Sequence, residues 1–224
     1  DTFLSEIVNH CDYGIDLHTG AIHRSNLPQI RADLSNTPAL SFAKKFDDTV
    51  IQHSLGKKGT LRRAATQAGI PAVTLEAGKS LSLQESAVNH GVSSIQKLIK
   101  QLNMLERTTS IHNNSSAIYH HSSWVRINFG GLLFSSVELG DHVTKNQILG
   151  TVTDPITNIR KDIISPYNGR VIGKAVNQVV MPGFAGFHVG IKQVGKRGDF
   201  DIPQGAFEID ATGKTVLPGL VDAH

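Results

Sequence analysis

The sequence has little cysteine, no long apolar run and no excess of charge of one sign. Its single cysteine, Cys11, cannot close an internal disulfide, so a disulfide-stapled scaffold is excluded. No run approaches the roughly 20 apolar residues of a membrane-spanning helix, so no membrane partner is expected. The 22 basic and 19 acidic residues give a net charge of +3 and are scattered along the 224 residues, which does not favour nucleic acid as a partner.

Several catalytic signatures and terminal signals are also absent. The chain has no Gly-x-Ser-x-Gly elbow, phosphate-binding loop, dinucleotide fingerprint or cysteine-rich zinc module. It has no initiator methionine and no signal-peptide pattern, and each end adjoins a strand-like segment. We therefore expect a fragment of a longer, cytoplasmic protein. With 39% hydrophobic and 18% charged residues, that fragment can build a packed core.

Strand-like and helix-like segments alternate over the first half of the chain. Strand patterns cover 12–19, 48–54 and 70–78, and helix patterns cover 36–46, 60–68 and 83–105. Residues 20–35 are mixed and contain Gly20 and Pro28, which predicts a long loop. Alternating strands and helices predict an α/β layer around a largely parallel sheet.

The composition changes after this region. Residues 107–123 are polar and rich in Ser, Asn and His, which is typical of a linker. Residues 124–192 consist of short β-rich runs separated by turn residues, which predicts a small barrel or sandwich. The predicted organisation is an α/β domain over 1–106, the linker, a β domain over 124–192 and a separate tail over 193–224.

Two polar side chains, Asp16 and His18, end the first predicted strand. Alternation along a strand places both on one face, and ligands of open α/β sheets bind beyond the carboxyl ends of the strands. A histidine there can bind a metal through one ring nitrogen while an aspartate orients the other. The alternative is a hydrogen-bonded core histidine beside a helix-capping aspartate.

Glu76 stands at the end of an otherwise apolar strand, in the segment VTLEAG. A carboxylate at the end of a buried strand is costly unless it is paired or used. Desolvation there would raise its pKa toward the range of a general base. The alternative is a glutamate that simply faces solvent beyond the last hydrogen bond of the strand.

Three arginines are candidates for substrate binding. Arg62 and Arg63 open a predicted helix, where a positive charge is unfavourable because it opposes the helix dipole. An arginine at this position is therefore better explained by another role, such as binding a carboxylate or polarising a carbonyl. Arg31 is a similar candidate in the predicted loop. A solvated helix face is the alternative for the first two.

Together these segments resemble the succinylglutamate desuccinylase/aspartoacylase family. The resemblance is carried, in order, by IDLHTGAIHRSNLPQIRADL, GTLRRAATQAGIPAVTLEAG, GDHVTKNQILGTVTDP, ISPYNGRVIG and VVMPGFAGFHVG, and it covers roughly residues 5–192. It implies a zinc-dependent deacylase. It also implies the fold class: an α/β part with a partial zinc-carboxypeptidase-like mixed sheet and helices, followed by a small all-β barrel-sandwich domain.

The resemblance also implies roles for individual residues. His18 would be a zinc ligand with Asp16 behind it, and Glu76 would be the general acid/base that takes a proton from zinc-bound water and passes it to the leaving amine. Arg62 would bind substrate or polarise the scissile carbonyl, with Arg31 as a further substrate-binding candidate. The resemblance further implies Zn²⁺ as cofactor and a small N-acyl amino acid-like molecule as substrate.

The chain departs from the family at its start. The family takes a second histidine and a glutamate from an upstream His-x-x-Glu motif, which this sequence lacks. Because a catalytic zinc needs about three protein ligands, we expect the full protein to be the hydrolase and this chain alone to be inactive.

Two other functions are left open by the second half. The β domain also resembles a lipoyl or biotinyl carrier, with Lys161 as the nearest lysine to a carrier position, although the usual flanking residues are missing. The tail IDATGKTVLPGLVDAH resembles the start of an amidohydrolase-superfamily barrel, which would make the protein a fusion. The leading prediction remains a zinc-dependent hydrolase that cleaves an amide bond with metal-activated water.

Overall fold

The computed structural model describes residues 2–105 and 116–191, all of which fall within one compact unit. We call residues 2–105 the α/β half and residues 116–191 the β half. The tail over 193–224, with its resemblance to an amidohydrolase start, lies outside the described residues, and so does most of the predicted linker.

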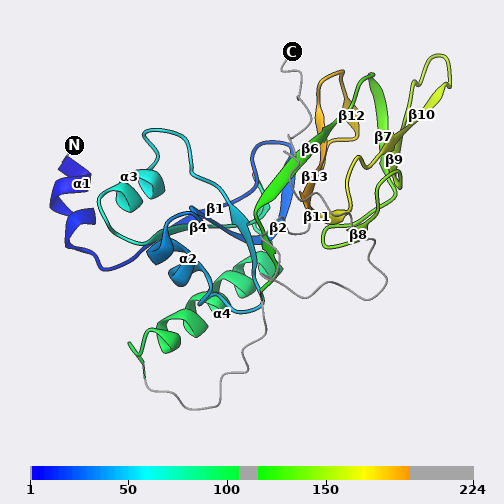
Figure 1. The fold of residues 1–224 in the computed structure, drawn as a ribbon. Helices are drawn as coiled ribbons and strands as arrows, with labels where there is room; N and C mark the ends of the chain where they lie inside the picture. The colour runs from blue at the N-terminus through cyan, green and yellow to red at the C-terminus, as the bar shows by residue number, and fades with distance from the viewer. Residues whose placement is uncertain (1, 106–115, 192–224) are drawn as a thin grey trace, which may run out of the picture. The chain divides into compact units, whose positions relative to one another are not determined.

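The α/β half alternates strands with helices, as predicted (Figure 1). Its strands are β1 (Gly14–His18), β2 (Arg24–Ala32), β3 (Val50–His53) and β4 (Ala72–Lys79). Its helices are α1 (Thr2–Glu6), the 3-10 turn η1 (Val8–His10), α2 (Thr37–Ala43), α3 (Leu61–Gln67) and α4 (Glu85–Gln101).

The β half contains strands and no helix among its described residues. Its strands are β5 (Ile118–Tyr119), β6 (His121–Arg126), β7 (Gly131–Ser135), β8 (His142–Val143), β9 (Ile148–Thr153), β10 (Arg160–Ile164), β11 (Gly169–Ala175), β12 (Val179–Val180) and β13 (Ala185–Ile191). Both β5 and the start of β6 lie inside the predicted linker.

The short helices begin and end where the sequence signals place them. Asn36 caps α2 by accepting a hydrogen bond from the backbone N–H of Ala39 at 3.0 Å, and Pro38 stands in the first turn. Helix α3 stops before Gly69, whose φ of 90° lies in the left-handed region that ends helices.

The prediction of a loop over 20–35 is wrong, because nine of these residues form the central strand β2. One edge of β2 hydrogen-bonds β4, while its other edge pairs first with β11 and then with β3. Pro28 sits where the pairing with β4 shifts register, between Asn26 and Gln29, so its missing N–H breaks no regular ladder bond.

The main sheet is mixed, which confirms the predicted fold class and corrects the expectation of a largely parallel sheet. Parallel pairs join β1 to β4, β2 to β3 and β3 to β5, whereas β2 runs antiparallel to β4 and to β11. The order β1-β4-β2-β11-β13-β6 makes one continuous sheet out of strands from both halves. The predicted division into two domains stays a prediction.

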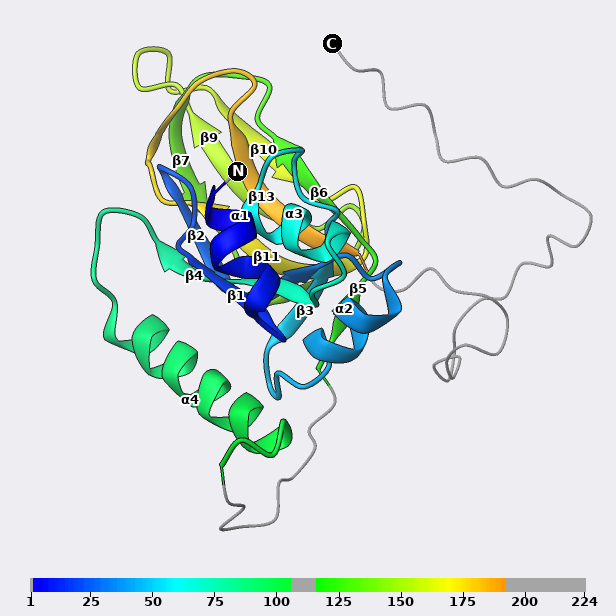
Figure 2. The same cartoon turned by 90° about the vertical axis from the view of Figure 1, so that its left-hand side faces the viewer.

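Helices cover both faces of the α/β half (Figure 2). On one face, α2 and α4 pack on apolar side chains of β2, β3 and β4 in a core that includes Ile30, Phe42, Ile51, Val73 and Leu98. On the other face, α3 lies over β1 and β4. The polar side chains of these strands point to this second face, which α3 covers only in part.

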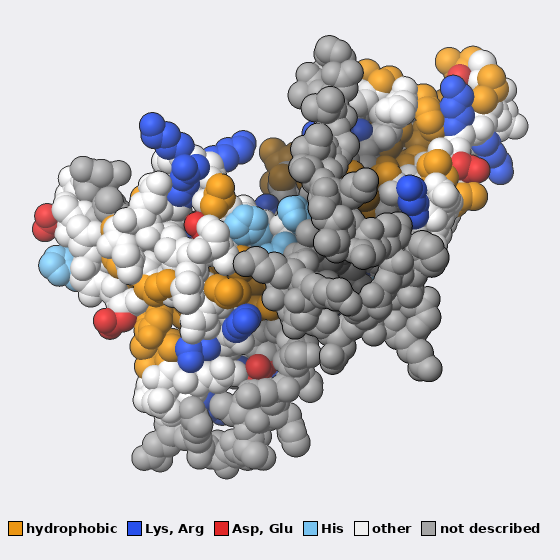
Figure 3. All heavy atoms as spheres, in the orientation of Figure 1, with side chains coloured by type: hydrophobic (Ala, Val, Ile, Leu, Met, Phe, Trp, Pro, Cys, Tyr) orange, Lys and Arg blue, Asp and Glu red, His pale blue; other side chains and the backbone are white. Residues whose placement is uncertain are grey.

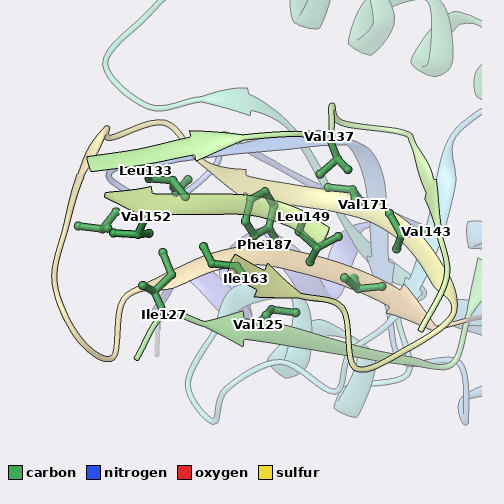
Figure 4. Packing of buried hydrophobic residues seen from close by; sticks show 13 residues of the cluster. Val125, Ile127, Leu133, Val137, Val143, Leu149, Val152, Ile163, Val171 and Phe187 are labelled. Atoms are coloured by element: carbon green, nitrogen blue, oxygen red, sulfur yellow. The ribbon is translucent and has the colours of Figure 1, made fainter. Parts of the chain in front are cut away.

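The core of the β half lies between two sheets (Figure 4). A four-stranded antiparallel sheet, β10-β9-β7-β12, faces the β11, β13 and β6 end of the main sheet. Phe187 of β13 is fully buried among valines, leucines and isoleucines from both sheets. This apolar sandwich packs against β11, which pairs with β2 on one edge and with β13 on the other.

Candidate active site

A cavity of about 340 Å³ opens on the polar face of the α/β half. It is lined by five of the residues that the sequence singled out: Asp16, His18, Arg31, Arg62 and Glu76. The remaining lining residues are Ser54, Gly56, Lys57, Thr60 and Thr74. The volume lies in the range of small-molecule sites, so five separately predicted residues form one ligand-sized pocket.

Strand register brings these residues together. His18 pairs with Glu76 and Asp16 with Thr74 across the parallel β1–β4 ladder. Gln29 of β2 lies opposite Glu76 on the other edge of β4. Side chains of directly paired residues point to the same face of a sheet, so three adjacent strands present their polar positions to one pocket.

Glu76 is held at the base of the pocket, with 8% of its surface exposed. Its Oε1 accepts a hydrogen bond from Asn26 Nδ2. Its Oε2 lies 2.9 Å from Arg31 Nε in an ion pair, although the N–H of Arg31 is not aligned for a hydrogen bond. Burial raises the pKa of Glu76 above its ordinary 4.5, against the opposing effects of Arg31, His18, Asn26 and Arg62.

The predicted pairing of His18 with Asp16 is present. Nε2 of His18 lies 3.0 Å from Oδ2 of Asp16, and the histidine side chain is half-exposed. The aspartate fixes one ring nitrogen, which leaves Nδ1 as the atom that could bind a ligand.

Arg62 is buried beneath the start of α3. Its Nε donates to Thr74 Oγ1 at 3.0 Å, its Nη1 to the carbonyl oxygen of Ser54 at 2.6 Å and its Nη2 to Ser54 Oγ at 3.2 Å. Burial lowers the pKa of Arg62, and the positive charge of Arg31 lowers it further. Arg63 donates to the carbonyl oxygen of Gly56 at 3.1 Å and does not line the pocket, so of these two neighbouring arginines only Arg62 belongs to the site.

The mouth of the pocket is basic. Lys57 lies on its rim, and Figure 3 shows Lys and Arg side chains gathered over the segment that precedes α3. Lys57, the half-buried Arg31 and the buried Arg62 line the same pocket as two carboxylates, those of Asp16 and Glu76. The carboxylate of Asp16 pairs with His18, and that of Glu76 pairs with Arg31 and Asn26. Neither carboxylate pairs with Arg62, so the wall around Arg62 favours an anionic or carbonyl group of a ligand.

Sequence reasoning missed Asn26 and Thr74. Asn26 fell in the segment predicted as a loop, where a polar residue carries no information. Thr74 is two residues before Glu76 on the same strand, and that period-two spacing is the signal that could have found it. Both residues act by bonding to other site residues, Asn26 to Glu76 and Thr74 to Arg62.

The pocket does not complete a zinc site from the residues at hand. A catalytic zinc takes about three protein ligands. Within residues 2–105 and 116–191, no three His, Cys, Asp or Glu side chains are grouped so as to hold a metal ion. His18 fits as one ligand with its aspartate partner, and the other ligands are not supplied by the described residues.

Residues 1–102 match the family model described as the Succinylglutamate desuccinylase/Aspartoacylase catalytic domain. Over these 102 of its 224 residues the chain is similar to the catalytic domain of the succinylglutamate desuccinylase/aspartoacylase family. No curated protein matches the chain.

Solved structures show the same fold. The Ectoine utilization protein EutE (DoeB) from Ruegeria pomeroyi superposes with a TM-score of 0.76 at 17% identity, over 86% of this chain and 64% of its own. A succinylglutamate desuccinylase from Silicibacter sp. TM1040 gives 0.73 at 15%, over 86% and 62%. A succinylglutamate desuccinylase/aspartoacylase from Rhodobacter sphaeroides gives 0.71 at 19%, over 85% and 62%. The chain thus spans less than two thirds of each of these structures.

None of the helices in the described part of the chain is both long and apolar enough to cross a membrane. The cytoplasmic location expected from the sequence stays a prediction.

The raised pKa of Glu76 predicts a pH-dependent stability. The folded state holds this proton more tightly than the unfolded state, so the contribution of Glu76 is fully present below pH 4.5 and is lost as the pH rises through the folded-state pKa. Glutamine has no carboxyl group to titrate, so Glu76→Gln does not lose this contribution to stability as the pH rises. The free energy of unfolding of Glu76→Gln, relative to that of the natural sequence, should therefore increase from about pH 4 to about pH 8 in urea titrations.

Glu138→Gln is the matched control, because it removes an exposed carboxylate of the β half that pairs with Lys174 at 2.6 Å. For each variant, the measured quantity is its free energy of unfolding minus that of the natural sequence. If this difference for Glu76→Gln, corrected by that for Glu138→Gln, stays constant or falls as the pH rises, the desolvated state of Glu76 is contradicted.

Proposed function

We propose that the protein is a zinc-dependent hydrolase that cleaves the amide bond of an N-acyl amino acid or a similar small molecule. The observation that carries this proposal is the environment of Glu76. This carboxylate is buried at the base of a pocket, faces an arginine and an asparagine, and lies beside a histidine on the next strand. The family match supports the deacylase class.

Glu76 would move the proton. Amide hydrolysis needs a group that accepts a proton from the attacking water and returns it to the leaving nitrogen. Burial raises the pKa of Glu76 toward that task, while Arg31 and Asn26 act in the opposite direction. Both oxygens are held by partners, so the carboxylate is oriented before the substrate arrives.

Arg62 would bind the acyl carbonyl or a substrate carboxylate. Its three hydrogen bonds to Thr74 and Ser54 fix the guanidinium plane and leave two of its five N–H donors without a partner among the described residues. A fixed planar donor next to the proton-transfer group can stabilise negative charge that develops on the carbonyl oxygen. Arg31, already paired with Glu76, would contribute through its positive charge.

Zinc would lower the pKa of a bound water and so supply the nucleophile. His18 is the ligand that this part of the chain offers, with Asp16 holding its second ring nitrogen.

The substrate would be a small molecule. The cavity volume suits one, and EutE from Ruegeria pomeroyi, which shares the fold at 17% identity, has also been solved with its product bound. We propose the N-acyl amino acid class because a basic wall that includes Arg62 and Lys57 favours a carboxylate-bearing ligand.

The carrier function is not favoured by the position of Lys161. A carrier lysine must project from a hairpin tip, but Lys161 lies within β10, paired with Val152 of β9. Its ammonium sits 5.1 Å from the centre of the Phe129 ring in a cation–π contact.

Removal of the Glu76 carboxylate should abolish most of the activity. In the full-length enzyme, Glu76→Gln keeps the size of the side chain but cannot accept the proton. We expect kcat for an N-acyl amino acid to fall by about 100- to 10,000-fold with a much smaller change in KM. The measurement is steady-state release of the free amine. Glu138→Gln is the control, and a Glu76→Gln enzyme with undiminished kcat would rule out the proposed role.

The ligand count predicts weak zinc binding by the 224-residue chain itself. One imidazole with its aspartate does not make a three-ligand site, so competition against a chromophoric chelator should detect only weak binding, which His18→Ala removes. His142→Ala, an exposed histidine of the β half, should leave it unchanged. A tight one-to-one site that includes His18 would contradict the ligand count.

A further inference from the structure

Asn26 lies at the junction between the two halves of the main sheet. On one side it pairs with Gly78 of β4, and on the other with Gly173 of β11. It is buried, and its Nδ2 donates to Oε1 of Glu76. One side chain therefore connects the candidate proton-transfer group with the β half.

The orientation of the Asn26 carboxamide is fixed by charge. Its amino group faces the carboxylate of Glu76, whereas its Oδ1 has no hydrogen-bond partner among the described residues. The reversed orientation would set an amide oxygen against a carboxylate oxygen, which is repulsive. The observed orientation therefore leaves Oδ1 without a hydrogen bond and retains the hydrogen bond from Nδ2 to Glu76.

Gly173 provides the space that this orientation requires. A Cβ atom on residue 173 would lie 2.6 Å from Oδ1 of Asn26 and 3.1 Å from Cβ of His188. The first distance is shorter than any normal contact. Any side chain on β11 at this point would push the carboxamide of Asn26 away from its present position.

The side chain that packs against Gly173, on the side away from Asn26, is itself held in place. His188 of β13 is buried and stacks on Trp124 of β6, with ring centres 4.5 Å apart and planes inclined by 9°. Its Nε2 lies 2.9 Å from Ser122 Oγ. Burial, together with the charge of Arg31, lowers the pKa of His188 to about 3, so a neutral ring fills this space.

We propose that Asn26 is a positioning residue for Glu76, and that β11 and β13 of the β half hold it in place through the gap at Gly173. Gly173 of β11 and His188 of β13 then support the position of Asn26, although neither residue lines the pocket. This inference rests on the proposed function for its kinetic consequence, but its structural part does not.

The structural part is tested by NMR on the 224-residue chain with labelled asparagine side chains. A carboxamide proton bonded to a carboxylate resonates away from the position of a free one, so Glu76→Ala should move the Asn26 Nδ2 proton signal toward the free position. Gly173→Ala should move the same signal in the same direction. Gly130→Ala is the matched control, because a Cβ there meets its nearest atoms only at 3.5 and 3.6 Å.

The proposal fails if Gly173→Ala leaves the Asn26 signal where it is, or if Glu76→Ala does not move it. Because Gly173→Ala adds bulk and can disturb folding, the kinetic test below also uses Asn26→Ala, which removes the carboxamide without adding any atom. The backbone amide spectrum of each variant reports whether the sheet is intact.

The kinetic part uses the full-length enzyme. Asn26→Ala and Gly173→Ala should lower kcat by about 100-fold with little change in KM, because a misplaced proton-transfer group slows chemistry more than binding. Gly130→Ala should retain full kcat. Suppose that the NMR signals move as expected and that Glu76→Gln inactivates the enzyme, while Asn26→Ala and Gly173→Ala leave kcat unchanged. In that case Asn26 does not position Glu76. If Glu76→Gln has no effect, the proposed function fails and the structural coupling stands alone.

Discussion

The structure depends on the burial of one carboxylate between two neighbouring strands. Glu76 sits on β4, which has β1 with His18 on one edge and β2 with Asn26 and Arg31 on the other. A charged group in such a place is stable only when paired, and the register of the three strands supplies the partners. The strand order β1-β4-β2 is thus what makes a site from residues far apart in the sequence.

The polar face of this sheet is poorly explained by stability alone. Gln29 is fully buried, yet neither atom of its amide group makes a hydrogen bond to any described residue. Unpaired buried polar groups cost free energy and are rare in ordinary cores. The opposite face of the same strands is a conventional apolar core under α2 and α4. Around Glu76, therefore, the second face holds polar groups, while a smaller apolar cluster under α3 includes Ala65 and Ala72.

The alternation of strand-like and helix-like segments predicted an α/β fold, and the family resemblance predicted that its sheet is mixed. Local signals in the sequence pointed to Asp16, His18, Arg62 and Glu76 of the pocket. Glu76 breaks an apolar strand, and Asp16 and His18 follow strand alternation at the end of β1. The sequence did not predict β2. That strand carries Asn26, Gln29 and Arg31 toward the pocket, so its polar content and Pro28 imitate a loop. Its strand character comes from pairing with β4, β3 and β11, which are distant in the sequence and leave no local pattern.

The central claim is that the carboxyl group of Glu76 is desolvated in the pocket while still facing Arg31. The most direct test is a pH titration of its side-chain carboxyl carbon by ¹³C NMR in the 224-residue chain. The account predicts a titration midpoint for Glu76 above the ordinary value of 4.5, because the carboxyl group is buried. The midpoint should fall when the pocket is opened to water. A midpoint at or below 4.5 would show a solvated or fully ion-paired carboxylate and would contradict the account.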